Sequence, residues 1–283
     1  MNAGETLVPS VMLNNGVRIP QLGLGTARLD NEETRRIVRE ALGLGYRLID
    51  TAASYGNEAG VGRGIVDSGL DRGEVFVTTK LRGAEQGYGS TLRALDTSLD
   101  RLALSYVDLY LIHWPLPRID AFVQSWAAME ELVAMGKTKA IGVSNFLPEY
   151  LDRLTATSTT VPAVNQIELH PRLPQVELRR ENARRGIATE SWSPLANGGD
   201  VLTSPVTAEI GAGYRRSPAQ VVLRWHAQQG LIAIPKASSA DRLRENLTVF
   251  DFDLTAQDML AIDALAVGGS AVGTEDPRTH EEF

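Results

Sequence analysis

The stretch RLIDTAASYG, residues 47–56, decides how the rest of the chain is interpreted. Its apolar start is typical of a buried strand, and Asp50 stands where that strand ends. Tyr55 follows on a short loop that closes with Gly56. In a barrel of alternating strands and helices, the loops after the strands carry the chemistry. We therefore expect polar side chains suited to one reaction to follow the neighbouring strands as well.

Strand-like runs alternate with helical patterns along most of the chain, which predicts parallel βα units. The predicted strands are residues 22–25, 47–50, 75–80, 107–113, 139–144, 163–168, 187–191 and 231–235. A helix is predicted after each strand, and the connection at 192–216 is predicted to be a glycine-rich loop. Eight such units in about 250 residues have the size of a (β/α)8 barrel. We predict an α/β TIM barrel that forms a single domain over residues 1–283.

Additional elements are expected at both ends of this barrel. Asn14-Asn15-Gly16 lies between short apolar runs and predicts an N-terminal β-hairpin. A C-terminal helix at 255–265 and a polar tail are expected to follow the last unit. A doubly wound open sheet is the alternative, but it would normally carry a G-x-G-x-x-G turn. Gly23-Leu24-Gly25 and Gly43-Leu44-Gly45 both lack the third glycine, so the barrel is favoured.

The composition narrows the classes of function. Hydrophobic residues make up 43% of the chain and charged residues 22%, which is ordinary for a globular protein. The absence of cysteine excludes disulfides, thiolate nucleophiles and Cys-ligated metals. A formal charge of -7 argues against nucleic-acid and anionic membrane partners. Residues 1–11 lack the features of a signal peptide, so we expect a cytoplasmic protein.

The residues at the strand ends form a chemically consistent set. Lys80 ends the third strand and His113 the fourth, next to the strand that ends at Asp50. A buried lysine and aspartate compensate each other's charge. A cation beside Tyr55 favours the phenolate and is expected to lower its pKa, which suits a general acid toward a carbonyl oxygen. Singly, each residue has a structural explanation; together, at one end of neighbouring strands, they predict a catalytic site.

Several sequence motifs identify the chain with a known family. They are DTAASYGNE at 50–58, TKL at 79–81, DLYLIHWP at 108–115, IGVSNF at 141–146, NQIELHP at 165–171, SPL at 193–195 and IPK at 234–236. With these motifs the chain resembles the aldo-keto reductase family over almost its whole length. The short segment after Pro115 and the tryptophan at 192 resemble the bacterial branch with 2,5-diketo-D-gluconate reductase more than the mammalian aldose reductases.

The resemblance implies an activity and a catalytic tetrad. It implies NADPH-dependent reduction of aldehydes, dicarbonyls or keto-sugars to alcohols, without a metal, by a monomeric enzyme. Tyr55 would give the proton, Lys80 would lower its pKa and Asp50 would hold Lys80. His113 would orient the carbonyl of the substrate.

The resemblance also implies which residues bind the cofactor. They lie at the ends of the later strands and on the last barrel helix: Ser144, Asn145, Gln166, Trp192, Ser193, Leu195, Lys236, Ser238, Arg242, Glu245 and Asn246. The first three would hold the nicotinamide carboxamide, and Trp192 would stack on the ring. Lys236 and Arg242 would grip the 2′-phosphate of NADPH. Ala237 replaces a serine of the family pattern, and Ser238 is expected to substitute for it; NADH would be a weaker cofactor.

Three positions are expected to shape the substrate pocket. Ala27 and Arg82 stand where relatives often carry large aromatic residues, which predicts a more open and more polar pocket. Trp114 would remain as an apolar wall. Two other classes of function stay open: a barrel that binds nucleotide without turnover, and a metal-dependent hydrolase. An intact tetrad disfavours the first, and the second would need clustered histidines or carboxylates where lysine and tyrosine stand.

Overall fold

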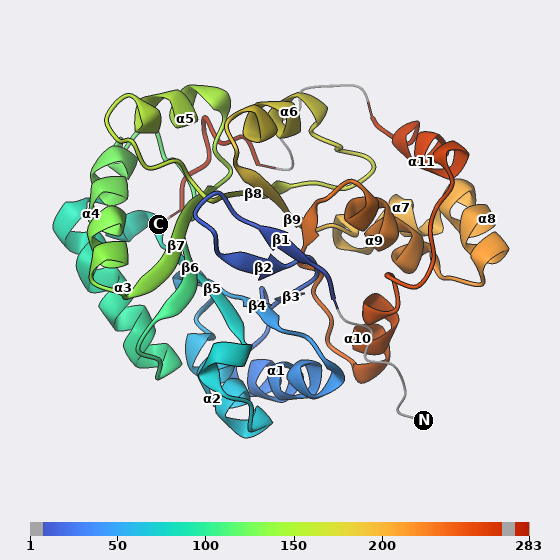
Figure 1. Cartoon of the computed structure of the whole chain (residues 1–283), viewed down its shortest axis with the longest axis horizontal. Helices are drawn as coiled ribbons and strands as arrows, with labels where there is room; N and C mark the ends of the chain where they lie inside the picture. The colour runs from blue at the N-terminus through green and yellow to red at the C-terminus, as the bar shows by residue number, and fades with distance from the viewer. Residues whose placement is uncertain (1–7, 268–274, 283) are drawn as a thin grey trace.

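Eight parallel strands form the wall of the predicted (β/α)8 barrel in the computed structural model, which describes residues 8–267 and 275–282 (Figure 1). The strands follow one another in chain order: β3 (Leu24–Gly25), β4 (Leu48–Asp50), β5 (Phe76–Leu81), β6 (Val107–Ile112), β7 (Thr138–Ser144), β8 (Val164–Glu168), β9 (Ala188–Trp192) and β10 (Ile232–Ala233). The first and last strands meet through bridges that pair Leu22 with Ala233 and Gly25 with Lys236. The backbone nitrogen of Gly23 donates to the Ala233 carbonyl at 2.9 Å, which closes the barrel.

Helices surround the strands, as the alternating pattern predicts (Figure 1). The barrel helices are α1 (Asn31–Leu44), α2 (Glu58–Ser68), α3 (Tyr88–Leu102), α4 (Phe122–Ala134), α5 (Pro148–Thr155), α6 (Val176–Arg184), α9 (Pro218–Gln228) and α10 (Ala240–Leu247), and α11 (Ala256–Asp263) follows them. Local chemistry sets their ends. The Asp30 side chain accepts a hydrogen bond from the Glu33 backbone at 2.8 Å and begins α1, and Gly45, with φ 111°, ends it.

The prediction that a glycine-rich loop precedes α9 is partly wrong, because this segment contains helices. Between β9 and α9 lie α7 (Asp200–Thr203) and α8 (Pro205–Tyr214). Pro205 occupies the first turn of α8, where a missing backbone N–H costs nothing. A Cβ on Gly211 would lie 2.4 Å from the Arg216 carbonyl oxygen. This glycine therefore permits a close approach to the following chain and does not mark a loop.

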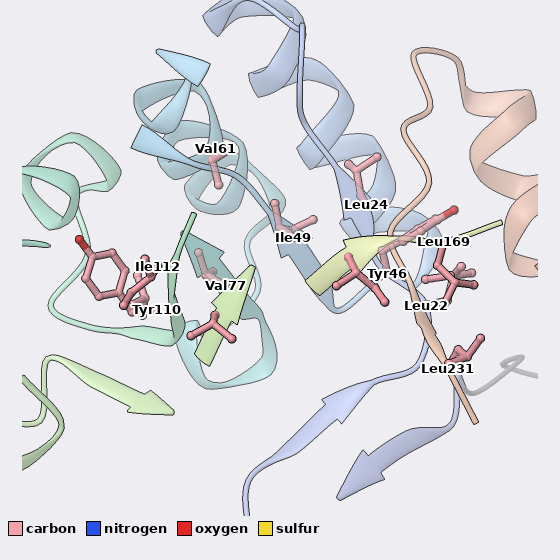
Figure 2. Packing of buried hydrophobic residues seen from close by; sticks show 14 of the residues in the cluster. Leu22, Leu24, Tyr46, Ile49, Val61, Val77, Tyr110, Ile112, Leu169 and Leu231 are labelled. Atoms are coloured by element: carbon pink, nitrogen blue, oxygen red, sulfur yellow. The ribbon is translucent and has the colours of Figure 1, made fainter. Parts of the chain in front are cut away.

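Two apolar clusters hold the barrel together, one outside the wall and one inside. Figure 2 shows part of the outer cluster, in which Ile49, Val77 and Tyr110 point from the strands toward the helices. The inner cluster contains Leu48 and Leu109 from the same strands, because successive strand residues face opposite sides.

The predicted hairpin closes one end of the barrel. It consists of β1 (Ser10–Met12) and β2 (Arg18–Pro20), paired antiparallel, and lies across the centre of the strand ring (Figure 1). Leu13 and Ile19 are buried in the inner cluster. The interior at this amino-terminal end of the strands is therefore apolar and sealed.

The interior at the carboxyl-terminal end of the strands is polar. Asp50, Lys80, Gln166 and Glu190 are all buried there, each at or near the end of its strand. Burying so many polar groups is costly unless they satisfy one another.

Among the described residues, no helix has the length and apolarity that a bilayer crossing requires.

Candidate active site

Lys80 lies at the centre of the polar end of the barrel. Its side chain is completely buried, and its Nζ donates to Asp50 Oδ1 at 2.6 Å and to the Thr51 carbonyl at 3.0 Å. The third neighbour of Nζ is the Tyr55 hydroxyl, at 3.4 Å. The registers of β4 and β5 bring Asp50 opposite Thr78, two residues before Lys80. The structure thus brings together the predicted aspartate, lysine and tyrosine.

The pKa of Tyr55 differs from the sequence prediction in its net direction. Burial raises the pKa of the phenol above its ordinary value, and the opposing effect of Lys80 does not fully offset it. The expectation of a net lowered pKa is therefore wrong for this structure, although Lys80 acts in the predicted direction. Tyr55 consequently stays protonated at neutral pH. Burial lowers the pKa of Lys80, but the combined effect of Asp50 and Tyr55 outweighs burial and raises the pKa above its ordinary value, so the ammonium stays charged.

A buried asparagine fixes the loop that carries Tyr55. This loop is the 3-10 turn η1 (Ala53–Tyr55), which ends at Gly56 with φ 69°. Asn57 Oδ1 accepts from the Thr51 hydroxyl at 2.8 Å, and its Nδ2 donates to the Thr26 carbonyl at 2.8 Å. The asparagine therefore ties the loop to the chain beyond β3. Sequence reasoning assigned it no role.

A second buried carboxyl group, Glu190, reaches the tetrad through Gln166. Gln166 Nε2 donates to Asp50 Oδ2 at 2.8 Å and to Glu190 Oε2 at 2.9 Å. Burial first, and then the negative charge of Asp50, raises the pKa of Glu190 to about 8. The carboxyl is therefore neutral at pH 7. The alternation of β9 places Glu190 inside the barrel, but its link to Asp50 spans 140 residues and no local pattern predicts it.

His113 and the predicted carboxamide-binding residues form one hydrogen-bonded row. Asn145, with φ 63°, donates from Nδ2 to the His113 carbonyl at 3.1 Å. The Ser144 hydroxyl donates to the Gln166 carbonyl at 2.8 Å, and Trp192 Nε1 donates to Asn145 Oδ1 at 2.9 Å. These contacts hold the indole of Trp192 at the mouth of the barrel. The rings of Tyr55 and His113 meet edge to face, with centroids 5.8 Å apart.

A cavity of about 680 Å³ opens above these groups. Its lining contains most of the residues that the sequence assigned to catalysis, cofactor and substrate: Ala27, Asp50, Tyr55, His113, Trp114, Ser144, Asn145, Gln166, Trp192, Ser193, Leu195, Lys236, Arg242, Glu245 and Asn246. Lys80 lies beneath the floor of the cavity and reaches it only through Asp50 and Tyr55. Arg28, which sequence reasoning missed, adds a cation to the wall.

Besides Lys80, two predicted residues lie outside this lining. Arg82 lines a separate cavity of about 300 Å³ together with Glu58, Glu85 and Arg101. The expectation that Arg82 shapes the substrate pocket does not agree with its absence from the lining of the large cavity. Ser238 also lies outside the large cavity, and its carbonyl accepts a hydrogen bond from Arg36 at 3.1 Å.

The composition of the cavity fits a dinucleotide with an additional phosphate. Amide and hydroxyl groups gather at the tetrad end, where Trp192 offers an aromatic face. The exposed cations Lys236 and Arg242 also line the cavity, and Arg242 lies in the first turn of α10, where the helix N-terminus also favours an anion. Ser239 caps that helix through a hydrogen bond from the Arg242 backbone at 3.5 Å. Neutral polar groups and cations in one cavity match a nicotinamide and a phosphate.

Comparisons with known proteins agree with this geometry. The family model described as the aldo/keto reductase family matches residues 21–267. A protein named aldo-keto reductase from Mycobacterium sp. (strain KMS) is 50% identical over 271 residues, which cover 96% of this chain and 97% of that relative. Morphine 6-dehydrogenase from Pseudomonas putida is 50% identical over 272 residues, which cover 92% of each chain.

A solved structure extends the similarity to three dimensions. A variant of Gox0644 in complex with NADPH superimposes with a TM-score of 0.92 at 45% sequence identity. The match covers 96% of this chain and 98% of that one. The fold is thus shared, over nearly the whole chain, with a protein that was crystallised with a nicotinamide cofactor.

Proposed function

The chain belongs to the aldo/keto reductase family, and from this premise we propose that it reduces carbonyl compounds to alcohols with NADPH. The proposed substrates are aldehydes, dicarbonyls and keto-sugars. One observation carries this proposal: a tyrosine and a histidine face one cavity while a buried lysine–aspartate pair supports the tyrosine from below.

Tyr55 is the proposed proton donor. NADPH, when bound, supplies the hydride that reduces the carbonyl carbon. The Tyr55 hydroxyl gives its proton to the carbonyl oxygen, so that hydride and proton together yield the alcohol. The ammonium of Lys80 stabilises the phenolate that remains, and Asp50 holds the ammonium in place.

The other residues of the cavity bind and orient. His113 directs the carbonyl oxygen toward Tyr55, and Ser144, Asn145 and Gln166 offer amide and hydroxyl groups to the carboxamide. Lys236 and Arg242 bind the 2′-phosphate, which favours NADPH over NADH. The complex of Gox0644 with NADPH supports this choice of cofactor. We also propose that the enzyme acts as a cytoplasmic, single-domain monomer.

The loss of NADPH absorbance at neutral pH tests the proposal. The wild type is compared with Tyr55→Phe on methylglyoxal, phenylglyoxal and a keto-sugar, and Tyr88→Phe, an exposed tyrosine on α3, serves as the matched control. We expect kcat to fall by roughly 10²–10⁴-fold in Tyr55→Phe and to stay unchanged in Tyr88→Phe. Tight NADPH binding without turnover of any carbonyl would instead support a nucleotide-binding barrel without activity.

A further inference from the structure

The C-terminal tail returns to the barrel mouth and packs against the catalytic histidine. His280 stacks on Trp114, with ring centroids 3.9 Å apart and planes inclined by 31°. Arg278 pairs with Glu149 at 2.9 Å and anchors the tail to α5. No local pattern marks His280 in the sequence, because its partner Trp114 lies 166 residues away. The tail is therefore a fixed part of the site's surroundings.

Glu282 makes the closest contact between the tail and the tetrad. Its Oε1 lies 2.6 Å from Nδ1 of His113. Its Oε2 accepts a hydrogen bond from the Gly83 backbone at 3.0 Å, and the Ser54 hydroxyl lies 3.3 Å from the same Nδ1. Only 12% of the Glu282 side chain is exposed. A carboxylate thus reaches the imidazole from the last described residues of the tail.

The surroundings keep this carboxylate charged. Burial alone would raise the pKa of Glu282, but the contacts with His113, Ser54 and Gly83 lower it below its usual value. An ionised carboxylate can only accept hydrogen bonds, so Nδ1 of His113 carries a proton and donates it in a hydrogen bond to Glu282. The hydrogen bond made by one ring nitrogen of a histidine determines whether the other nitrogen carries a proton and in which direction it points. The nitrogen that remains for a ligand in the cavity is then Nε2.

Glu282 does not occupy the cavity itself. The lining of the 680 Å³ cavity includes Tyr55, His113 and Trp114, whereas Glu282 and His280 are absent from it. The tail therefore contacts His113 from outside the cavity lining. This position differs from that of a plug, which would fill the space above Tyr55.

Gly83 shows that the chain is built to receive the tail. A Cβ added to Gly83 would lie 2.3 Å from the Glu282 carbonyl oxygen and 2.4 Å from Leu116 Cδ1. Real Cβ atoms do not approach backbone oxygens so closely, so any side chain here would displace the tail. Gly83 begins the 3-10 turn η3 (Gly83–Glu85), directly after the strand that carries Lys80.

We propose that Glu282 is a positioning residue for His113: it holds the Nδ1 proton and fixes the ring so that Nε2 faces the carbonyl. This proposal rests on the proposed function, because it assigns His113 to the orientation of a substrate carbonyl. Glu282 acts in the way that a carboxylate orients a functional imidazole in many catalytic and metal sites. The contribution comes from the penultimate residue of the chain.

The experiment compares Glu282→Gln, Glu282→Ala and Gly83→Ala with the matched control Glu281→Gln. Glu281 lies 3.2 Å from the exposed Arg118 and makes no contact with His113 that the structure records. Nitrogen-15 resonances of the His113 ring report which nitrogen carries a proton, and they need no substrate. Steady-state kinetics with methylglyoxal and fluorescence titration with NADPH separate kcat from cofactor binding.

We expect Nδ1 to be protonated in the wild type and in Glu281→Gln. In Glu282→Ala and Gly83→Ala the ring resonances change, and kcat falls about tenfold while the Kd for NADPH stays within about twofold. Glu282→Gln should show a smaller change, because the amide oxygen can still accept the Nδ1 proton. Unchanged His113 resonances in Glu282→Ala overturn the proposal even if the enzyme proves inactive. An increased kcat also overturns it, because it would make the tail an obstruction.

Discussion

The two ends of the barrel interior are built from the same strands and solve different problems. At the amino-terminal end, Leu48, Phe76 and Leu109 pack under the hairpin residues Leu13 and Ile19. At the carboxyl-terminal end, residues two or four positions further along β4 and β5 are Asp50 and Lys80, fully buried and paired at 2.6 Å. One end gains stability from apolar contact, whereas the other holds a buried ion pair within a network of polar groups. We infer that the sealed end supports the fold so that the polar end can serve the reaction.

Removing the lysine should produce the largest effect, because it breaks the polar end. In Lys80→Met, Asp50 remains buried without its partner, which costs about 3–5 kcal/mol of the free energy of unfolding. Tyr55 loses its cation, and kcat should fall by roughly 10²–10⁴-fold. Denaturant unfolding and NADPH consumption measure the two effects.

A double variant separates those two effects. In Asp50→Leu/Lys80→Met both charges are gone, so most of the lost stability should return, because apolar replacement of a buried pair is often neutral. Activity should stay absent. Recovery of activity in the double variant would show that the charges are structural and not catalytic.

A substitution at the sealed, amino-terminal end of the barrel should lower stability and leave activity unchanged. Ile19→Ala removes a completely buried side chain of the hairpin and should lower the free energy of unfolding by about 2–5 kcal/mol. The kcat of the folded protein should stay within about twofold, because the tetrad is not touched. A large loss of kcat at full folding would contradict the division between the two ends.

The sequence predicts this division only in part. The strand ends at Asp50, Lys80 and His113 were predictable because strand patterns and polar residues are local features. The net direction of the Tyr55 pKa was not, since burial depends on how the whole barrel packs. The helix α8 was hidden because glycines that permit close packing look like loop residues in the sequence. The contact of Glu282 with His113 joins residues 169 positions apart, and no local signal marks it.

Glu190 should make stability depend on pH at the polar end. Its pKa is about 8 in the folded protein, above the ordinary value of a glutamate, so the folded state binds the proton more tightly than the unfolded state. Stability is then lost as the pH rises from the unfolded-state pKa toward 8. Glu190→Gln has no such proton and should be more stable than the wild type by roughly 4–5 kcal/mol at pH 9.

The comparison between pH values is the control for that prediction. At pH 5 the wild-type carboxyl is protonated in the folded state, and the two proteins should differ little. Urea unfolding at both pH values measures this. If the wild type and Glu190→Gln were equally stable at pH 9, the ionisation of Glu190 would cost no stability, and its pKa would not be raised by burial and Asp50.

The smallest effect is expected at the outer rim, where charges are exposed to solvent. Arg242→Ala should raise the Kd for NADPH about tenfold and leave the Kd for NADH unchanged, because only NADPH carries the 2′-phosphate. Arg244→Ala, on the same helix and outside the cavity lining, is the matched control. If the Kd values for NADPH and NADH rose equally, Arg242 would not contact the 2′-phosphate.

The most direct test of the central claim follows a labelled hydride. The enzyme is incubated with phenylglyoxal and NADPH that carries deuterium on both positions of nicotinamide C4, and the alcohol is analysed by mass spectrometry. We predict one deuterium on the former carbonyl carbon with the wild type and almost no product with Tyr55→Phe. Binding of NADPH without any deuterium in the product would contradict carbonyl reduction at the polar end of the barrel.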